Sequence, residues 1–320
     1  MPIVTNPTYS PPFIFKNTHI NTIYSARLRH TFPLPYVRKR VTMPDDDFVD
    51  LDWSEMGSDK LVFCLHGLEG NSRRPYVAGM MKRFNTEGWD AVGMNLRGCS
   101  GEDNRYLKGY HSGCSDDLDW VLNTVLVEKK YRQIVLVGFS VGGNIALKYT
   151  GEKGRNLPSE ISHVIAYSVP CNLESCSLIM ETPKNFVYLL QFLITLKQKA
   201  KEKAEKFPNQ FDLQRVLKAK NFRDFDSAYT APINGFVDCF DYWTKASSAP
   251  LLKNIAVPTL LINALDDTFL APQCFPTDVA NENPNFHLEM PKRGGHLGFM
   301  SPDTEGYLWT EHRAWAFVKQ

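Results

Sequence analysis

The sequence predicts an α/β protein with a mostly parallel, doubly wound sheet and an inserted helical cap. Two observations carry this prediction. Short apolar runs alternate with segments of helical spacing along most of the chain, which is the pattern of a parallel sheet covered by helices. The alternation stops between Cys171 and Leu251, where the spacing is helical and the residues are rich in aromatics and Lys. This stretch separates two candidate core strands, so it predicts an insertion over the sheet.

The expected elements follow in chain order. Val37–Met43 and Phe48–Trp53 alternate between apolar and polar residues, which predicts an antiparallel hairpin at an edge of the sheet. Continuous apolar runs predict buried parallel strands over Leu61–Leu65, Ala91–Asn95, Ile134–Phe139, His163–Tyr167, Thr259–Asn263 and Asn285–Glu289. Helical spacing predicts helices over Pro75–Glu87, Ser115–Lys129, Ser140–Glu152 and Thr304–Val318.

These elements predict one α/β core with an interruption. The core is formed by residues 1–170 and 251–320, with residues 1–36 as an N-terminal extension packed on it. Residues 171–250 form the helical cap. No internal repeat is evident.

Composition excludes several classes of protein. A chain of 320 residues can bury a sizeable core, and 43% hydrophobic residues is too high for a disordered protein. The balance of 36 Lys and Arg against 35 Asp and Glu argues against a nucleic-acid partner. The 7 Cys are odd in number and form no Cys-x-x-Cys pair, so neither a disulfide framework nor a zinc site is indicated. We expect no metal and no cofactor.

Nothing in the sequence indicates secretion or a membrane anchor. The first residues lack a basic segment followed by an apolar one. The longest apolar run, Phe186–Leu196, is shorter than the roughly 20 residues that a membrane span requires. We therefore expect a cytoplasmic protein. The Lys-rich run Lys197–Lys206 is interpreted as a solvated helix face, with peripheral membrane contact as the alternative. The oligomeric state is not indicated.

Ser140 is the candidate nucleophile. It stands in Gly138-Phe-Ser-Val-Gly142, between the apolar run Ile134–Val137 and the helical segment Gly143–Tyr149. A serine in a sharp turn between a buried strand and a helix is lifted above the sheet edge. The N–H groups at the helix N-terminus also favour developing negative charge. The plain alternative is a serine that caps a helix.

A serine needs a base, and in this arrangement the chain order is Ser, then Asp or Glu, then His. His296 lies in the Gly-rich loop that follows the last predicted strand, where the base is expected. His287 falls inside that strand and His312 in the terminal helix, which predicts a structural role for the first and a surface position for the second.

The acid should follow the strand Thr259–Asn263, where two aspartates are adjacent. Neighbouring side chains point in different directions, so one carboxylate can reach the histidine while the other caps or is solvated. We favour Asp267 over Asp266 because it heads an apolar loop that ends in Pro272. Its role would be to orient the histidine and to stabilise the imidazolium.

The donors of an oxyanion hole should be the backbone N–H of Val141, directly after the nucleophile, and that of Leu68, in the loop after an early strand. His66 in that loop is expected to hold it rather than to act as the base. Aromatic residues of the insertion are candidates for an acyl pocket, with ordinary cap packing as the alternative. They are Phe186, Tyr188, Phe192, Phe236, Phe240, Tyr242 and Trp243.

Several segments together resemble the YheT-like branch of the α/β-hydrolases, whose eukaryotic relatives include abhydrolase-domain lipases and yeast ethyl-ester acyltransferases. The segments are Pro11–Tyr24, Leu65–Gly70, Asn95–Glu102, Tyr110–Gly113 and Gly138–Asn144. The resemblance runs from about residue 11 to the C-terminal helix. It implies Ser140 as nucleophile, Asp267 as acid and His296 as base, in ester hydrolysis or acyl transfer. His111 in the fourth segment could line the pocket or merely hold its loop.

The sequence thus predicts a carboxylesterase-like serine hydrolase that works through an acyl-enzyme on short- to medium-chain, small-molecule or lipid-like esters. An acyltransferase to an alcohol and a (phospho)lipase are the alternatives. A non-catalytic binding protein on the same fold is a further reading, since a fold does not guarantee a function.

Overall fold

A single mixed sheet forms the centre of the computed structural model, which describes residues 3–5, 7–29, 33–303 and 305–320. Within these residues the strand order is β1-β9-β8-β7-β6-β4-β5-β3-β2. The strands are β1 (Ile3–Val4), β2 (Val37–Thr42), β3 (Phe48–Ser54), β4 (Lys60–Leu65), β5 (Asp90–Asn95), β6 (Gln133–Phe139), β7 (Ile161–Tyr167), β8 (Thr259–Ile262) and β9 (Phe286–Glu289). The β2–β3 and β3–β5 pairs are antiparallel, and the other pairs are parallel.

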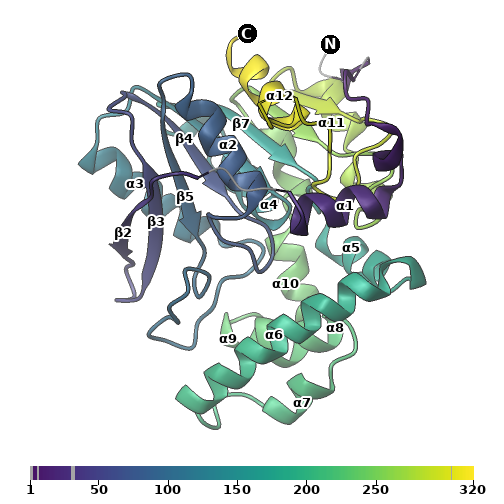
Figure 1. The fold of residues 1–320 in the computed structure, drawn as a ribbon. Helices are drawn as coiled ribbons and strands as arrows, with labels where there is room; N and C mark the ends of the chain where they lie inside the picture. The colour runs from purple at the N-terminus through teal and green to yellow at the C-terminus, as the bar shows by residue number, and fades with distance from the viewer. Residues whose placement is uncertain (1–2, 6, 30–32, 304) are drawn as a thin grey trace.

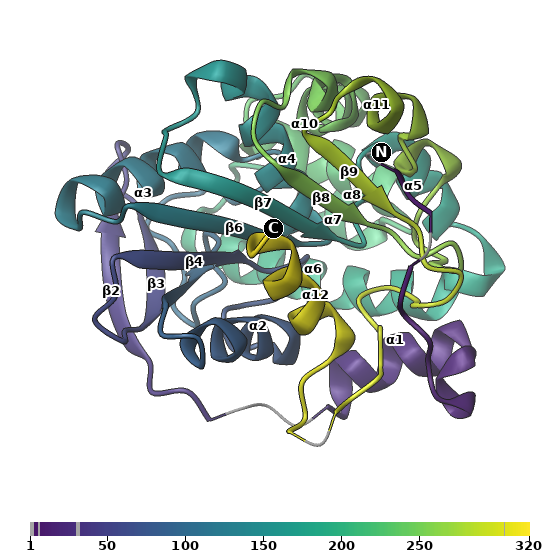
Figure 2. The same cartoon turned by 90° about the horizontal axis from the view of Figure 1, so that it is seen from above.

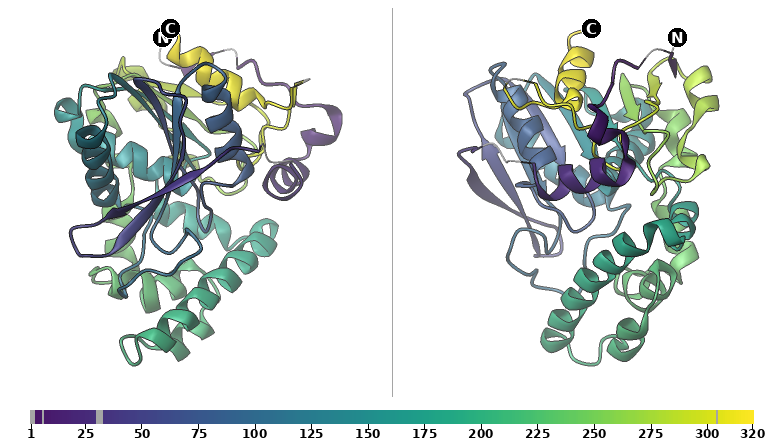
Figure 3. Two further views of the ribbon diagram at one scale, coloured as in Figure 1. Left: turned by 60° about the vertical axis from the view of Figure 1, so that its left-hand side comes forward. Right: turned by 45° about the vertical axis from the view of Figure 1, so that its right-hand side comes forward.

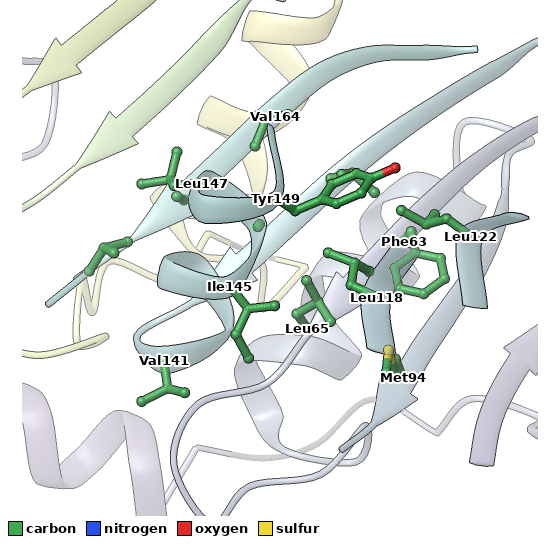
Figure 4. Close-up of a cluster of buried hydrophobic side chains, with 14 of the residues drawn as sticks. Phe63, Leu65, Met94, Leu118, Leu122, Val141, Ile145, Leu147, Tyr149 and Val164 are labelled. Atoms are coloured by element: carbon green, nitrogen blue, oxygen red, sulfur yellow. The ribbon is translucent and has the colours of Figure 1, made fainter. Parts of the chain in front are cut away.

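Helices cover both faces of this sheet (Figure 2). One face packs against α2 (Pro75–Asn85) and α12 (Trp309–Val318), and the other against α3 (Ser115–Glu128), α4 (Val141–Lys153) and α11 (Thr277–Glu282). The fold is therefore doubly wound, as predicted. Figure 4 shows how the second face is filled: Phe63 and Leu65 of β4 meet Leu118 of α3 and Ile145 of α4. Burial of these apolar side chains fixes the helices against the strands.

The helices that lie between β7 and β8 along the chain form the lower part of Figure 1. They are α5 (Leu173–Met180), α6 (Phe186–Lys206), α7 (Leu213–Lys218), α8 (Phe222–Phe225), α9 (Ala231–Ile233) and α10 (Cys239–Ala246). They have apolar clusters of their own, such as the one that joins Leu189 and Leu193 of α6 to Val216 of α7. We call residues 171–250 the cap; their separation from the core as a domain stays a prediction.

The predicted strands and the edge hairpin are confirmed to within one or two residues at most ends. The terminal helix is shorter than expected, because α12 begins at Trp309; Thr304, where the prediction starts, lies outside the described residues. Before α12 the chain turns instead, since the Asp303 carboxylate accepts the N–H of Tyr307.

Two N-terminal elements were not expected. β1 extends the sheet beside β9, and α1 (Thr18–Arg27) follows the N-cap Asn17, whose side chain accepts the N–H groups of His19 and Ile20. Figure 3 shows α1 outside the sheet, beside the upper end of α6. Of the predicted N-terminal extension, residues 1–2, 6 and 30–32 lie outside the described residues.

Candidate active site

Ser140 occupies the sharp turn between β6 and α4. Its φ of 53° and ψ of −118° lie outside the regions that non-glycine residues favour, and its N–H donates to the Tyr167 carbonyl at 2.8 Å. The glycines on either side permit this turn. A Cβ on Gly138 would come within 2.5 Å of Gly143 Cα, and one on Gly142 would overlap the backbone carbonyls of Leu65, the last residue of β4, and of His66. A strained serine held in this way is the arrangement of a nucleophile elbow.

His296 and Asp267 complete a chain of hydrogen bonds with this serine. His296 Nε2 lies 2.9 Å from Ser140 Oγ, and His296 Nδ1 lies 2.9 Å from Asp267 Oδ2. The Asp267 side chain is fully buried, and its other oxygen accepts the Phe269 N–H at 2.9 Å. The Phe269 ring stacks on the imidazole, with centroids 4.2 Å apart. The structure therefore brings together the three residues that the sequence singled out, although they are far apart along the chain.

The neighbouring Asp266 points away from the imidazole and holds the loop that carries it. Its carboxylate accepts the Gly295 N–H at 2.9 Å, and its backbone carbonyl accepts the Thr18 hydroxyl of α1 at 2.8 Å. Burial raises the pKa of Asp266 above the usual range of an aspartate. Of the two adjacent acids, Asp267 is the one that contacts the histidine.

The N-terminal helix α1 also supports His296, a contribution that was not predicted from the sequence. Thr22 Oγ accepts the backbone N–H of His296 at 2.9 Å, and the Ser25 hydroxyl donates to the Leu297 carbonyl at 2.7 Å. Both residues lie in or next to the Pro11–Tyr24 segment noted for its resemblance. That segment was the available signal, but only the fold shows that it reaches a loop near the other end of the chain.

Leu68 and Val141 line the same pocket as Ser140. The loop of Leu68 is held from several sides through Glu69, which has a φ of 54°. The Tyr110 hydroxyl accepts the Glu69 N–H at 2.9 Å and donates to its carboxylate at 2.7 Å. Lys199 of α6 lies 2.8 Å from the other carboxylate oxygen. The segment that begins at Tyr110 thus braces this loop, and the cap contacts it through one ion pair.

His66 holds the same loop, as expected. Its Nδ1 donates to the Gly67 carbonyl at 2.8 Å, and its Nε2 accepts the Leu96 N–H at 3.1 Å, which requires a neutral ring. Complete burial accordingly lowers the pKa of His66 to about 4. His287 packs in β9 against the Phe317 ring, and His312 lies on the surface beside Asp303. These positions agree with the roles predicted for them.

The pocket beside Ser140 lies between the sheet edge and the cap and has a volume of about 390 Å³. This size suits small ligands. Of the seven cap aromatics proposed for it, Phe192, Tyr242 and Trp243 line it. The prediction is wrong for Phe186 and Phe240, which are exposed at the surface. Tyr188 and Phe236 are absent from the lining; they pack on Phe269 and on His111 instead.

Two half-buried polar residues, His111 and Asp226, line this pocket. The His111 ring packs edge-on against the rings of Phe236 and Tyr242, and burial lowers the pKa of His111 to about 3. Asp226, which the sequence analysis did not single out, accepts the Trp243 Nε1–H at 2.8 Å, and burial raises its pKa to about 6. At both positions the uncharged form of the side chain is therefore favoured more strongly than it would be in water.

The Lys-rich part of α6 is not simply a solvated face. Lys203 is buried and reaches the Tyr106 carbonyl at 2.7 Å and the Asp103 carboxylate at 2.8 Å. Together with the Lys199 contact, this attaches the helix to loops of the core. The prediction of a solvated face is therefore wrong for these two lysines, while Lys201 between them is exposed.

No group of three or more His, Cys, Asp or Glu in the described part of the chain has the arrangement of a metal site. Likewise, no helix among the described residues is both long and apolar enough to cross a bilayer.

Comparison with known proteins identifies the fold and the family. Residues 60–303 match the family model of the alpha/beta hydrolase fold. The chain is 34% identical to YheT, a candidate esterase of Escherichia coli (strain K12), over 93% of this chain and 89% of YheT. It is 29% identical to human phospholipase ABHD3 over 93% of this chain and 75% of that protein.

Solved structures agree on the fold. The esterase Pf2001 of Pyrococcus furiosus superposes with a TM-score of 0.59 over 97% of this chain and 98% of that chain, at 16% identity. On these matches, and on the strand–turn–helix geometry around Ser140, the chain belongs to the α/β-hydrolase family, in the branch that includes YheT.

Proposed function

We propose that this protein is a serine hydrolase of carboxylic esters that works through an acyl-enzyme. The observation that carries the proposal is the continuous hydrogen-bonded chain from Ser140 Oγ through the His296 imidazole to the buried Asp267 carboxylate. The names of the relatives support the reaction class, because they include an esterase and a phospholipase.

In the proposed reaction Ser140 Oγ attacks the ester carbonyl carbon while His296 Nε2 takes the hydroxyl proton. Asp267 keeps the Nδ1 proton of the imidazole facing it and stabilises the imidazolium that forms. The C–O bond to the alcohol then breaks, and the proton on Nε2 passes to the leaving oxygen. Water, activated by the same nitrogen, hydrolyses the acyl-enzyme and restores the serine.

The N–H groups of Leu68 and Val141 are proposed to bind the oxyanion. Both residues lie in the pocket beside Ser140, and Val141 is the first residue of α4, where the N–H points out of the helix without an intrahelical acceptor. The bracing of Glu69 by Tyr110 and Lys199 keeps the Leu68 peptide in place before the substrate arrives.

The acyl group is proposed to be short to medium in length and to lie against Phe192, Trp243 and their apolar neighbours in the cap. A series of p-nitrophenyl esters tests this: activity should peak below C16, and a peak at C16 would contradict the proposal. Transfer of the acyl group to an alcohol would use the same acyl-enzyme. Product analysis with added ethanol separates the two, because transfer yields an ethyl ester.

The nucleophile is tested by Ser140→Ala, with hydrolysis of a soluble p-nitrophenyl ester as the readout. The variant should lose about 10³-fold or more in kcat, whereas a loss below about tenfold would refute the assignment. Ser177→Ala is the matched control. This second serine lines the same pocket, is buried, and has no hydrogen-bond partner among the described residues, so its removal should leave kcat near the wild-type value.

A further inference from the structure

We propose that an apolar face shared by two neighbouring helices docks this protein on an anionic lipid surface. The face, called here the docking face, consists of Phe13, Ile20 and Ile23 in and before α1 and Val187, Leu190 and Ile194 of α6. Each of these large apolar side chains is more than two-fifths exposed; Phe13 reaches 87% and Val187 72%. Soluble proteins rarely gather so many apolar side chains in one place without a partner.

The first half of α6 is apolar on both of its sides. Leu189 and Leu193 point inward and are buried in the cap, and Phe192 lines the pocket. Val187, Leu190 and Ile194 follow the spacing of one helix face and point outward. A helix that is apolar all round is normally buried. The exposed apolar side chains on the outer side of this half of α6 therefore indicate an apolar binding partner.

The two parts of the docking face adjoin each other. His19 Nδ1 of α1 lies 3.0 Å from the Tyr188 hydroxyl of α6, and the two rings stack with centroids 5.8 Å apart. Figures 1 and 3 both show α1 beside the N-terminal end of α6. The two helices that carry the exposed apolar side chains are therefore in direct contact.

The charges around the docking face identify its partner. Residues 10–29 and 182–201 contain no Asp or Glu, while Lys16, Arg27 and Lys184 are exposed there. The nearest acid before α6, Glu181, lies 3.8 Å from Arg223. The acids of α6 itself, Glu202 and Glu205, lie in its second half. Apolar side chains with basic residues around them fit an anionic lipid surface. A second copy of this chain fits less well, because it would bring two basic faces together.

The docking face lies on the outer sides of helices whose inner sides belong to the candidate active site. Phe192 and Leu196 of α6 line the pocket, and Thr22 of α1 accepts the N–H of His296. A lipid surface bound here would therefore lie close to the pocket. The attachment would be peripheral, and it differs from the contact considered above for the Lys-rich half of α6, where Lys199 and Lys203 are engaged with the core.

Sedimentation with vesicles tests the proposal without reference to ester hydrolysis, so each proposal can fail alone. The wild-type protein should bind vesicles of phosphatidylcholine with phosphatidylglycerol more tightly than vesicles of phosphatidylcholine only. Val187→Asp should weaken binding to the anionic vesicles about tenfold, because a buried valine of this size contributes about that factor. Lys184→Glu should reduce the preference for anionic vesicles.

Val127→Asp is the matched control, since Val127 is 85% exposed on α3, outside the docking face. It should bind vesicles as the wild type does, and thermal melts should show that both aspartate variants fold. The proposal is overturned if the wild type does not sediment with anionic vesicles, or if the two variants lose binding equally. A third outcome would also overturn the proposal: the wild type does not bind vesicles but self-associates, and Val187→Asp abolishes the self-association. That result would assign the docking face to a second copy of this chain.

Discussion

Asp266 and Asp267 are chemically identical neighbours with different surroundings. Only Asp267 contacts the imidazole, while Asp266 binds the Gly295 N–H. Asp267→Asn should therefore lower kcat for ester hydrolysis about 10³–10⁴-fold, because the amide cannot hold the required histidine tautomer. Asp266→Asn, which keeps an acceptor oxygen for Gly295, should cost less than about tenfold. Equal losses in steady-state kinetics would contradict the roles assigned to the pair.

His111 provides a prediction about pH. Burial depresses the pKa of His111 to about 3 in the folded protein, whereas an unfolded histidine titrates near 6.5. As the pH falls, this histidine therefore binds its proton in the unfolded chain before it does so in the folded protein. The contribution of His111 to the free energy of unfolding is complete above about pH 6.5 and is lost as the pH falls toward 3. The expected loss from this residue is about 2 kcal/mol between pH 7 and pH 5.

His111→Phe removes the titration and keeps an aromatic ring against Phe236 and Tyr242. The melting temperature of this variant should fall less than that of the wild type when the pH is lowered from 7 to 5. His66 is also neutral in the folded protein, with a pKa of about 4. A part of the pH dependence of the melting temperature should therefore remain in both proteins. An unchanged pH dependence would show that His111 is not buried as a neutral ring.

At the scale of elements, α6 contacts the Leu68 loop through the Lys199–Glu69 ion pair. Lys199→Met keeps most of the side chain's length and removes its charge, which loosens the loop but leaves the nucleophile untouched. We expect kcat to fall about 5- to 30-fold, which corresponds to about 1–2 kcal/mol of lost transition-state stabilisation.

Lys201→Met is the matched control for this variant, because Lys201 is exposed two residues further along the same helix. It should leave kcat unchanged. If Lys199→Met raised KM alone, the lysine would act in substrate binding and not in positioning the loop.

At the scale of the whole molecule, Arg97 joins three parts of the core. The buried guanidinium binds Asp117 at the start of α3 through two hydrogen bonds of 2.8 and 2.9 Å, and it reaches Asp45, in the turn between β2 and β3, at 3.0 Å. Arg97 lies in the segment Asn95–Glu102, noted in the sequence for its resemblance alone, and these contacts give that part of the segment a structural explanation. Removal of one partner from such a network leaves buried charge without compensation.

Arg97→Met should accordingly lower the free energy of unfolding by about 3–5 kcal/mol. The melting temperature should fall by about 10 °C, given the usual scaling for a large domain. Arg97→Lys should recover only a part of this, because an ammonium cannot form both bonds to Asp117. If the melting temperature of Arg97→Met stayed within about 2 °C of the wild-type value, instead of falling by roughly 10 °C, this account of the segment would be contradicted.

The sequence predicted much of this fold for a physical reason. Buried parallel strands are continuous apolar runs, and the order of serine, acid and histidine follows from where such strands end, so Ser140, Asp267 and His296 could be named without coordinates. Contacts between distant segments could not. The Thr22–His296 and Lys203–Tyr106 bonds join polar residues whose one-dimensional pattern is that of a solvated surface, and β1 is too short to produce any pattern.

The central claim is that His296 activates Ser140 as a nucleophile. It is tested most directly by treating the intact protein with a fluorophosphonate and locating the adduct by peptide mass spectrometry. The account predicts one adduct for each chain, on the peptide that contains Ser140, and its loss in both Ser140→Ala and His296→Ala. An unlabelled protein, an adduct on another serine, or labelling that survives in His296→Ala would contradict it.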